Sequence, residues 1–339
     1  MRQPALALHA DPPAGWDARV GSTWLGTGFA AASRAVGCRA YFAEDERDRA
    51  VVLVRSVPVP FVDGWTRRAK VYVDARDGEF LRDLAESLTR LGVSHVRVGD
   101  QMHAWAGAWP GPWPALRPET LYVCRLDRVT GTDEELRRAL REPARKNIRK
   151  AERAGVTVTE ATSEREVEEL FHLLEATGER IHEHGSKAVY PLPFFRAAWR
   201  HMVPRGEATF LLARAGDALL AGQLYFLSAE SVAYYHGGST RERELTPKQG
   251  PSAIFWHALR LARDRAVPFD MGGITPNDDT GDPQAGVTEF KRQWVPHRTA
   301  VEIADIVLSP AKVRFQERVL LPLWERAHPL YLRAFGRAS

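Results

Sequence analysis

Hydrophobic positions along the chain follow two different periods, and this alternation predicts a protein that mixes helices and strands. Short runs rich in strand-favouring residues at Val51–Val54 and Val71–Val73 predict two strands. Apolar residues three and four positions apart over Glu79–Leu91 predict an amphipathic helix, which Gly92 would terminate. A strand is expected next, over 93–98. The first part of the chain therefore contains a helix, a glycine and a strand in that order.

The later part of the chain repeats this order of elements. A strand at Thr120–Leu126 precedes the capping-box pattern Thr132–Glu135, which predicts the start of a helix. Pro143 would break this helix or begin a second one that ends near Gly155. The same signals predict strands at 156–158, 209–213, 222–227 and 232–235, and helices over 163–174 and 252–265. Two similar α+β halves are the simplest architecture, with a boundary within 130–155.

Composition adds limits to this picture. At 339 residues the chain fits two domains better than one, and 44% hydrophobic with 27% charged residues is typical of a globular protein. Cys38 and Cys124 are the only cysteines, which excludes a disulfide framework and a zinc cluster and suits a reducing compartment. The sequence has no secretory signal pattern and no apolar run long enough to span a membrane. We therefore expect a cytoplasmic protein.

The net charge of +4 conceals a strongly basic segment at 137–153 with eight cations and two glutamates. On a helix, five of these cations share one face, opposite an apolar face. These five residues are Arg145, Lys146, Arg149, Lys150 and Arg153. Such a face is either an ordinary solvated surface, a phosphate-binding surface for an RNA backbone, or a site for an anionic lipid headgroup or a pyrophosphate-bearing substrate. Spacing alone does not choose among them.

A second stretch has the features of a ligand site. Phe269–Gly273 is a strand that ends in two glycines, where a ligand can approach the backbone closely. Phe290 and Lys291 follow a polar loop, and a lysine beside a pocket can stabilise an oxyanion or hold a phosphate. The alternative is that Lys291 is a surface residue after a core phenylalanine and that Asp270 caps the loop through backbone N–H groups.

These segments resemble one family. The run Arg145–Val156 is similar to the R-x-x-I-R-x-A-x-x-x-G-V segment of the Fem (FemABX) nonribosomal peptidyltransferases. Phe269–Ile274, followed by Gly286–Lys291 and the aromatic Trp294, also resembles that family. The resemblance covers most of 118–298.

The resemblance implies two tandem GNAT-like domains, each a mixed sheet flanked by helices. The expected N-terminal domain is 1–140, the domain with the transfer site is 141–310, and a helical tail at 311–339 packs on the body. The implied activity is transfer of an amino acid from aminoacyl-tRNA to an amine, on a peptidoglycan precursor peptide or an antibiotic intermediate. Aminoacyl-tRNA is then a co-substrate and no other cofactor is expected. We expect a monomer, without an integral membrane segment and with peripheral membrane contact left open.

The resemblance also implies roles for individual residues. Lys291, with Phe290 beside it, would lie near the acyl carbonyl in the transfer site, and Asp270 is a candidate proton acceptor. Arg180 is similar to an arginine that contacts the acceptor's phosphate. The other expected substrate-binding residues are His184, Tyr235, Gly272, Gly273 and Trp294. The expected tRNA-binding residues are Arg145, Lys146, Arg149, Lys150, Arg153 and Lys248. No metal ligands are expected.

Two alternatives remain open. The first is an acyl-CoA-dependent N-acyltransferase on the same fold, which needs backbone N–H groups at a helix N-terminus to hold the CoA pyrophosphate. The corresponding segment, Pro247–Ser252, has proline at its first position, and Pro251 removes one N–H donor. The second is a noncatalytic protein that binds RNA or an anionic surface through the basic helix.

Overall fold

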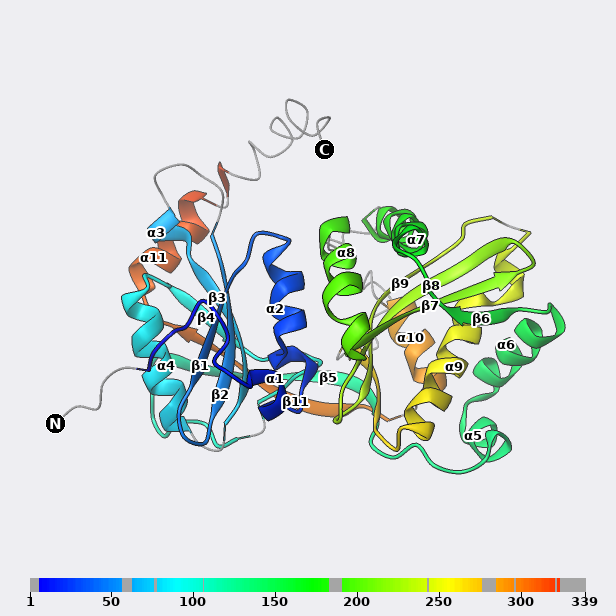
Figure 1. Ribbon diagram of the computed structural model, residues 1–339, viewed down its shortest axis with the longest axis horizontal. Helices are drawn as coiled ribbons and strands as arrows, with labels where there is room; N and C mark the ends of the chain where they lie inside the picture. Colours follow the sequence, from blue (N-terminus) through cyan, green and yellow to red (C-terminus); the bar gives the residue numbers. More distant parts are fainter. Residues whose placement is uncertain are drawn as a thin grey trace.

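The computed structural model describes residues 6–56, 63–75, 78–105, 107–182, 191–242, 244–275, 285–295, 297–320 and 322–323, without side chains for 63–64 and 179–182. Its strands form one eleven-stranded sheet in the order β1-β2-β3-β4-β11-β5-β10-β9-β8-β7-β6, with helices on both faces (Figure 1). Most neighbouring strands are antiparallel, and the pairs β3–β4 and β9–β10 are parallel. The predicted mixed α/β fold class is confirmed.

The first half of the chain forms one end of this sheet. Its elements are α1 (Trp16–Arg19), η1 (Thr23–Leu25), α2 (Thr27–Arg34), β1 (Arg39–Glu44), β2 (Arg49–Arg55), α3 (Asp63–Thr66), β3 (Arg68–Asp74), α4 (Gly78–Arg90), β4 (His95–Val98) and β5 (Leu116–Leu126). Strands β1, β2 and β3 are antiparallel, and α4 then carries the chain to β4, which is parallel to β3. The helix, glycine and strand expected from the sequence are confirmed, and Gly92 ends α4 with φ +84°.

The second half repeats this plan at the other end. Its elements are α5 (Asp133–Ala139), α6 (Glu142–Arg153), β6 (Thr157–Glu160), α7 (Glu164–His182), α8 (Leu192–His201), η2 (Val203–Arg205), β7 (Ala208–Ala215), β8 (Ala218–Leu227), β9 (Val232–Ser239), η3 (Thr246–Lys248), α9 (Gly250–Asp264), β10 (Phe269–Ile274), α10 (Ala285–Trp294) and β11 (Thr299–Val307). Strands β6 to β9 are antiparallel, and α9 leads to β10, parallel to β9. The expectation of two similar halves is confirmed.

The two halves exchange one strand each. Strand β5 follows β4 in the chain but pairs with β10 of the second half. Strand β11 follows β10 but pairs with β4 of the first half. The two exchanged strands also pair with each other, from Val123 with Thr299 to Leu116 with Ile306, and they run between the halves in Figure 1. The sheet is therefore continuous from one half to the other.

A shared hydrophobic core also joins the halves. Helix α2 packs against α8 between them (Figure 1). Trp24 of the first half contacts Phe226 of the second, with ring centroids 4.9 Å apart, and Phe29 contacts both Phe226 and Phe194. The Thr23 hydroxyl donates to the Leu227 carbonyl at 2.6 Å. Because these side chains are buried in one cluster, separating the halves would expose a large apolar surface.

Local sequence signals fix the start of the second half. The Thr132 hydroxyl accepts a hydrogen bond from the Glu135 amide, and the Glu135 carboxylate accepts one from the Thr132 amide, as the capping box predicts. Pro143 lies in the first turn of α6, where its missing N–H costs nothing, and Gly155 follows the helix with φ +65°. The chain is described to residue 323, and here α11 (Pro310–Phe315) and the short helix η4 (Gln316–Leu320) pack on the first half. In the described residues we find no helix with the length and apolar character needed to cross a bilayer.

One carboxylate in the contact between the halves is unusually placed. Glu207 lies beside the first turn of α2, where its carboxylate fills the space that a side chain at Gly28 would occupy. Its Oε2 is buried and has no hydrogen-bond partner among the described residues. Burial, and secondarily the charge of Asp17, raise the pKa of Glu207 to about 7, although Arg205 opposes the shift.

The raised pKa predicts a pH-dependent contribution to stability. In the folded protein Glu207 holds its proton up to about pH 7, whereas in the unfolded chain it loses it near pH 4.5. The contribution of the protonated Glu207 side chain to the stability of the folded protein is therefore complete below pH 4.5, and it is lost as the pH rises to 7. Glu207→Gln should gain stability relative to the wild type over this interval, by about 1.4 kcal/mol for each pH unit between the two pKa values. Urea unfolding at pH 5 and pH 8 measures this, and Glu46→Gln, at an exposed glutamate, is the control. An identical pH dependence in all three proteins would contradict the assignment.

Candidate functional site

Strands β9 and β10 separate partway along their length. Their parallel pairing covers only Phe269 with Val232 and Asp270 with Ala233. Beyond this point β9 continues along β8, and β10 shifts its register on β5 between Asp270 and Gly273. The two glycines of β10 therefore lie at an opening in the sheet, where the backbone can approach a ligand closely.

Lys291 reaches this opening from α10. Its side chain is buried, with 7% of the residue exposed, and its Nζ donates to the Gly273 carbonyl at 2.7 Å. The same Nζ lies 5.8 Å from the centre of the Tyr234 ring. Burial lowers the pKa of Lys291 to about 8, and the charge of Asp270 acts in the opposite direction. The alternative that Lys291 is an ordinary surface lysine is wrong.

Asp270 holds the bend of β10 in place. The residue is 2% exposed, and its Oδ1 accepts a hydrogen bond from the Gly272 amide at 2.6 Å. Gly272 has φ +74°, a backbone conformation that favours glycine. Burial raises the pKa of Asp270 to about 6, against the effects of the Gly272 amide, Arg125 and Lys291. Asp270 thus fixes the bend after which the Gly273 carbonyl meets the ammonium of Lys291.

A loop of the first half, residues 99–105, completes the site, and the sequence patterns did not predict it. Met102 Cε lies 3.2 Å from the position that a Cβ would take at Gly272, and Lys291 Nζ lies 3.8 Å from the same position. The Gln101 amide fills the space that a side chain at Gly273 would occupy. Gly99 directly follows β4. The pattern of a strand end followed by glycine, which predicted a ligand site at β10, is therefore also present here.

Asp100 anchors this loop through both carboxylate oxygens. Its Oδ1 accepts hydrogen bonds from the amides of Met102 and His103, at 2.8 and 2.9 Å. Its Oδ2 accepts from Lys70 Nζ at 2.6 Å and from the Tyr72 hydroxyl at 3.0 Å. Burial alone would raise the pKa of Asp100, but the ammonium of Lys70 and the two amides hold it below its usual value. The loop is thereby fixed to β3.

The predicted aromatic residues lie around the site rather than at the ammonium. Phe290 packs against Phe255, with ring centroids 5.3 Å apart. Trp294 is 1% exposed and contacts the same Phe255, which makes it a core residue of the second half. Tyr235 stacks on Phe226 at 4.3 Å in the core shared by the halves. Substrate contacts of Trp294 and Tyr235 stay predictions.

Two predicted residues fall where the structure gives no side chain. Arg180 belongs to α7, with only its backbone described, and His184 lies outside the described residues. Their roles toward the acceptor stay predictions. Within the described parts of the chain, no group of three or more His, Cys, Asp and Glu side chains has the geometry to hold a metal ion.

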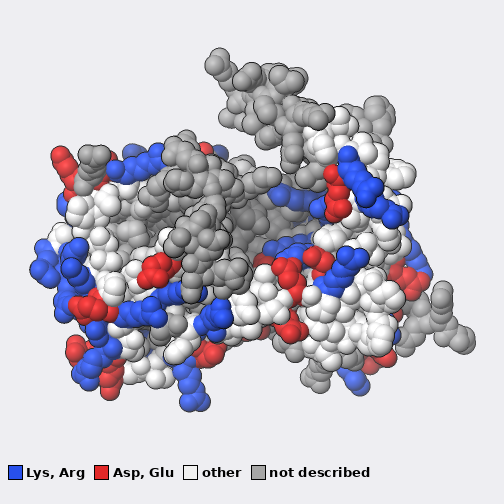
Figure 2. Space-filling view, turned by 180° about the vertical axis from the view of Figure 1, so that it is seen from behind, with Lys and Arg blue, Asp and Glu red and all other residues white. Residues whose placement is uncertain are grey.

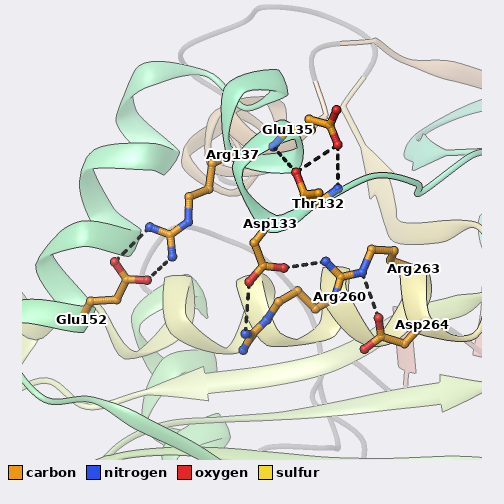
Figure 3. A network of polar contacts seen from close by, with 8 residues as sticks. All are labelled: Thr132, Asp133, Glu135, Arg137, Glu152, Arg260, Arg263 and Asp264. Carbon is orange, nitrogen blue, oxygen red and sulfur yellow. Dashed lines mark hydrogen bonds and ion pairs between the residues drawn. The ribbon is translucent and has the colours of Figure 1, made fainter.

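Helix α6, which carries the basic segment, is linked to α5 by an ion pair, and α5 is linked in turn to α9 (Figure 3). Arg137 of α5 pairs with Glu152 of α6. Asp133 of α5 accepts from Arg263 of α9 at 2.5 Å and lies 3.6 Å from Arg260. Together with the buried apolar face of α6, these contacts hold the helix in one orientation.

The cations on the exposed face of α6 fall into two groups. Arg145 and Arg149 both pair with Glu142, at 2.9 and 2.8 Å, so that one carboxylate partly neutralises them. Lys146 and Lys150 have no described carboxylate partner. Figure 2 accordingly shows basic and acidic side chains side by side over the end of the molecule that carries α6. Two further cations accompany the lysines: Arg153, one turn further along, and Lys248, in η3, which packs against α6.

Comparisons with known proteins agree with this geometry. Residues 137–292 match the family model of an acetyltransferase (GNAT) domain. The crystal structure of FemX superposes with a TM-score of 0.60 at 13% sequence identity, over 86% of this chain and 93% of FemX. A conserved protein of unknown function from Bacteroides thetaiotaomicron superposes with a TM-score of 0.55 at 10% identity, over 88% of this chain and 98% of that protein. No curated protein matches the chain by sequence.

These findings confirm the GNAT-like fold and, at the level of the fold, the resemblance to the Fem family. The matched segment 137–292 contains Asp270, the glycines of β10 and Lys291. The opening between β9 and β10 therefore lies in the segment that matches the acetyltransferase (GNAT) domain model.

The charges at this opening should be coupled. Because the carboxylate of Asp270 raises the pKa of Lys291, Asp270→Asn should move the pKa of Lys291 below its value of about 8. Lys291 can be observed by NMR of its ε-methylene group, assigned with Lys291→Met. Asp217→Asn, which removes an exposed carboxylate at the turn between β7 and β8, is the control and should leave the titration in place. An unchanged or higher pKa of Lys291 in Asp270→Asn would contradict the coupling.

Proposed function

We propose that the chain is an aminoacyltransferase that moves an amino acid from aminoacyl-tRNA to an amine acceptor and so forms a peptide bond. The observation that carries the proposal is the buried ammonium of Lys291 at the bend of β10, in the half that also carries the basic face of α6. A confined cation at a glycine-lined opening suits a reaction that develops negative charge on an acyl oxygen. The acceptor is a peptidoglycan precursor peptide or an antibiotic intermediate.

The reaction needs little covalent assistance, because the ester of aminoacyl-tRNA is already activated. The neutral acceptor amine attacks the ester carbonyl and forms the new C–N bond while the carbonyl oxygen takes the negative charge. Lys291 stabilises that oxygen as a point charge, and the oxyanion then collapses and expels the tRNA hydroxyl group. The amine's surplus proton passes to Asp270 or to the departing oxygen. In this mechanism Asp270 also positions Gly272 and Gly273 around Lys291.

Binding of tRNA is assigned to the exposed face of α6. Lys146 and Lys150 are one helical turn apart, and neither has a described carboxylate partner, so both can neutralise backbone phosphates. Arg153, at the end of α6, and Lys248, in η3 beside α6, are assigned to the same surface. The paired Arg145 and Arg149 must first leave Glu142, and we expect them to contribute less.

An acyl-CoA-dependent N-acyltransferase is the second candidate, favoured by the match of residues 137–292 to an acetyltransferase family model. The helix that would hold the CoA pyrophosphate is α9. It begins at Gly250, which packs closely on Leu220, and Pro251 in its first turn has no N–H to donate. The usual set of backbone donors is therefore incomplete, and for this reason aminoacyl-tRNA is the favoured donor.

Replacing the buried ammonium tests the proposed chemistry. Lys291→Met keeps the length of the side chain and removes its charge, and it should lower the transfer of radiolabelled amino acids from charged tRNA to amine acceptors by about 100-fold or more. Lys312→Met is the control. It makes the same change at a lysine of α11 that also donates to a glycine carbonyl, that of Gly92, and it should retain full transfer. Acylation by acetyl-CoA in place of transfer from tRNA would overturn the proposal in favour of the second candidate.

The salt dependence of tRNA binding tests the basic face. Lys146→Ala/Lys150→Ala should reduce the slope of log affinity against log salt concentration by about 1.5, because two phosphate contacts are lost. Arg82→Ala/Arg90→Ala removes the same charge from α4 of the other half and should leave the slope as in the wild type. Equal slopes for both double variants would show that α6 is an ordinary solvated helix.

A further inference from the structure

The loop that the first half places over β10 has no role in the mechanism above. Its Met102 side chain is half-buried, and its methyl group is the nearest side-chain atom to the point where a Cβ would stand at Gly272. The ammonium of Lys291 flanks the same point at 3.8 Å. A thioether methyl group of one half and the reactive cation of the other therefore face one small volume.

We propose that Met102 is a specificity-determining residue that limits the size of the side chain on the transferred acyl group. This inference rests on the proposed function, since it takes Lys291 as the group that holds the acyl carbonyl oxygen. An oxygen bound by Nζ lies about 3 Å from it, and the α-carbon with its side chain follows two bonds further on. The Met102 methyl group lies within that reach. It is 3.2 Å from the Cβ position at Gly272 and Lys291 Nζ is 3.8 Å from the same position, so the two atoms cannot be further apart than the sum of these distances.

The loop is built to keep Met102 at this place. Asp100 accepts the Met102 amide at 2.8 Å and is itself held by Lys70 and Tyr72 of β3. The Gly99 amide donates to the Val71 carbonyl at 2.7 Å, which ties the start of the loop to the same strand. The backbone of Met102 is thus fixed while its unbranched side chain keeps its three rotatable bonds, which suits a wall that contacts an apolar group.

Binding of stable donor analogues tests the inference without turnover. The probes are 3′-deoxy-3′-aminoacylamino-adenosines with alanyl, leucyl and phenylalanyl groups, measured by calorimetry. Met102→Ala should raise the affinity for the leucyl and phenylalanyl analogues relative to the alanyl one by about 10-fold or more, since the space of several methylene groups is opened. Met102→Leu conserves the volume and should keep the wild-type ratio within about 3-fold.

The outcomes separate a size limit from a structural role. If Met102→Ala weakens or strengthens all three analogues equally, Met102 only supports the loop and the inference is overturned. Failure of the wild type to bind either the adenosine analogues or acyl-CoA overturns it as well. If the wild type binds no adenosine analogue but binds acyl-CoA, the proposed function fails, and the ratio of hexanoyl-CoA to acetyl-CoA affinity in the same variants then decides the role of Met102 by itself.

Discussion

The pairing of β5 with β11 is the constraint on which the rest of the structure depends. Each strand leaves its own half and completes the sheet of the other, and the two are hydrogen-bonded to each other between the halves. The site uses groups from both sides of this junction: Lys291 and the glycines of β10 from the second half, and Met102 with Gln101 from the first. Without a rigid connection, side chains from opposite halves could not both lie beside the same glycine. The shared core around Trp24 and Phe226 adds apolar burial to this connection.

The electrostatics of the site follow from the same packing. Lys291 and Asp270 are both buried, and burial disfavours the charged form of each, which brings their pKa values to about 8 and about 6. Each group opposes the shift of the other. Near neutral pH the site therefore retains an ammonium and a carboxylate, a combination that suits oxyanion stabilisation together with proton acceptance. On the surface, Glu142 pairs with Arg145 and Arg149 and so neutralises part of the exposed face of α6. From the composition alone, this face would be described as uniformly basic.

Much of the fold could be predicted from local signals. The capping box at Thr132, the proline at the start of α6 and the glycine after α4 act within a few residues, so their effect is legible in the sequence. Strand β11 and helix α2 were not predicted. The Thr299–Val307 segment is apolar only in part because its two ends face different surroundings, and the TGFAAASR segment of α2 consists mainly of small residues whose burial comes from α8. Both elements owe their stability to contacts with the other half of the molecule.

The part of the candidate site that lies in one segment of the chain could be predicted, because its signals are local. Asp270, Gly272, Gly273 and Lys291 belong to one segment of chain, and a strand end with two glycines followed by a lysine is a recognisable pattern. Nothing in that segment indicates that a loop beginning at Gly99 lies against it, because that contact depends on how two distant strands exchange places. The family resemblance gave Trp294 a place beside the substrate, which stays a prediction; the structure shows the Trp294 ring packed in the core against Phe255.

The strand exchange also bears on how the polypeptide emerges from the ribosome. Strand β4 is complete early in synthesis, yet its partner β11 is the last of the described strands to be made. Until β11 leaves the exit tunnel, the edges of β4 and β5 present unpaired backbone groups, a state prone to association with other nascent chains. The native pairing at the edge of β4 can therefore form only after residues 299–307 have been translated.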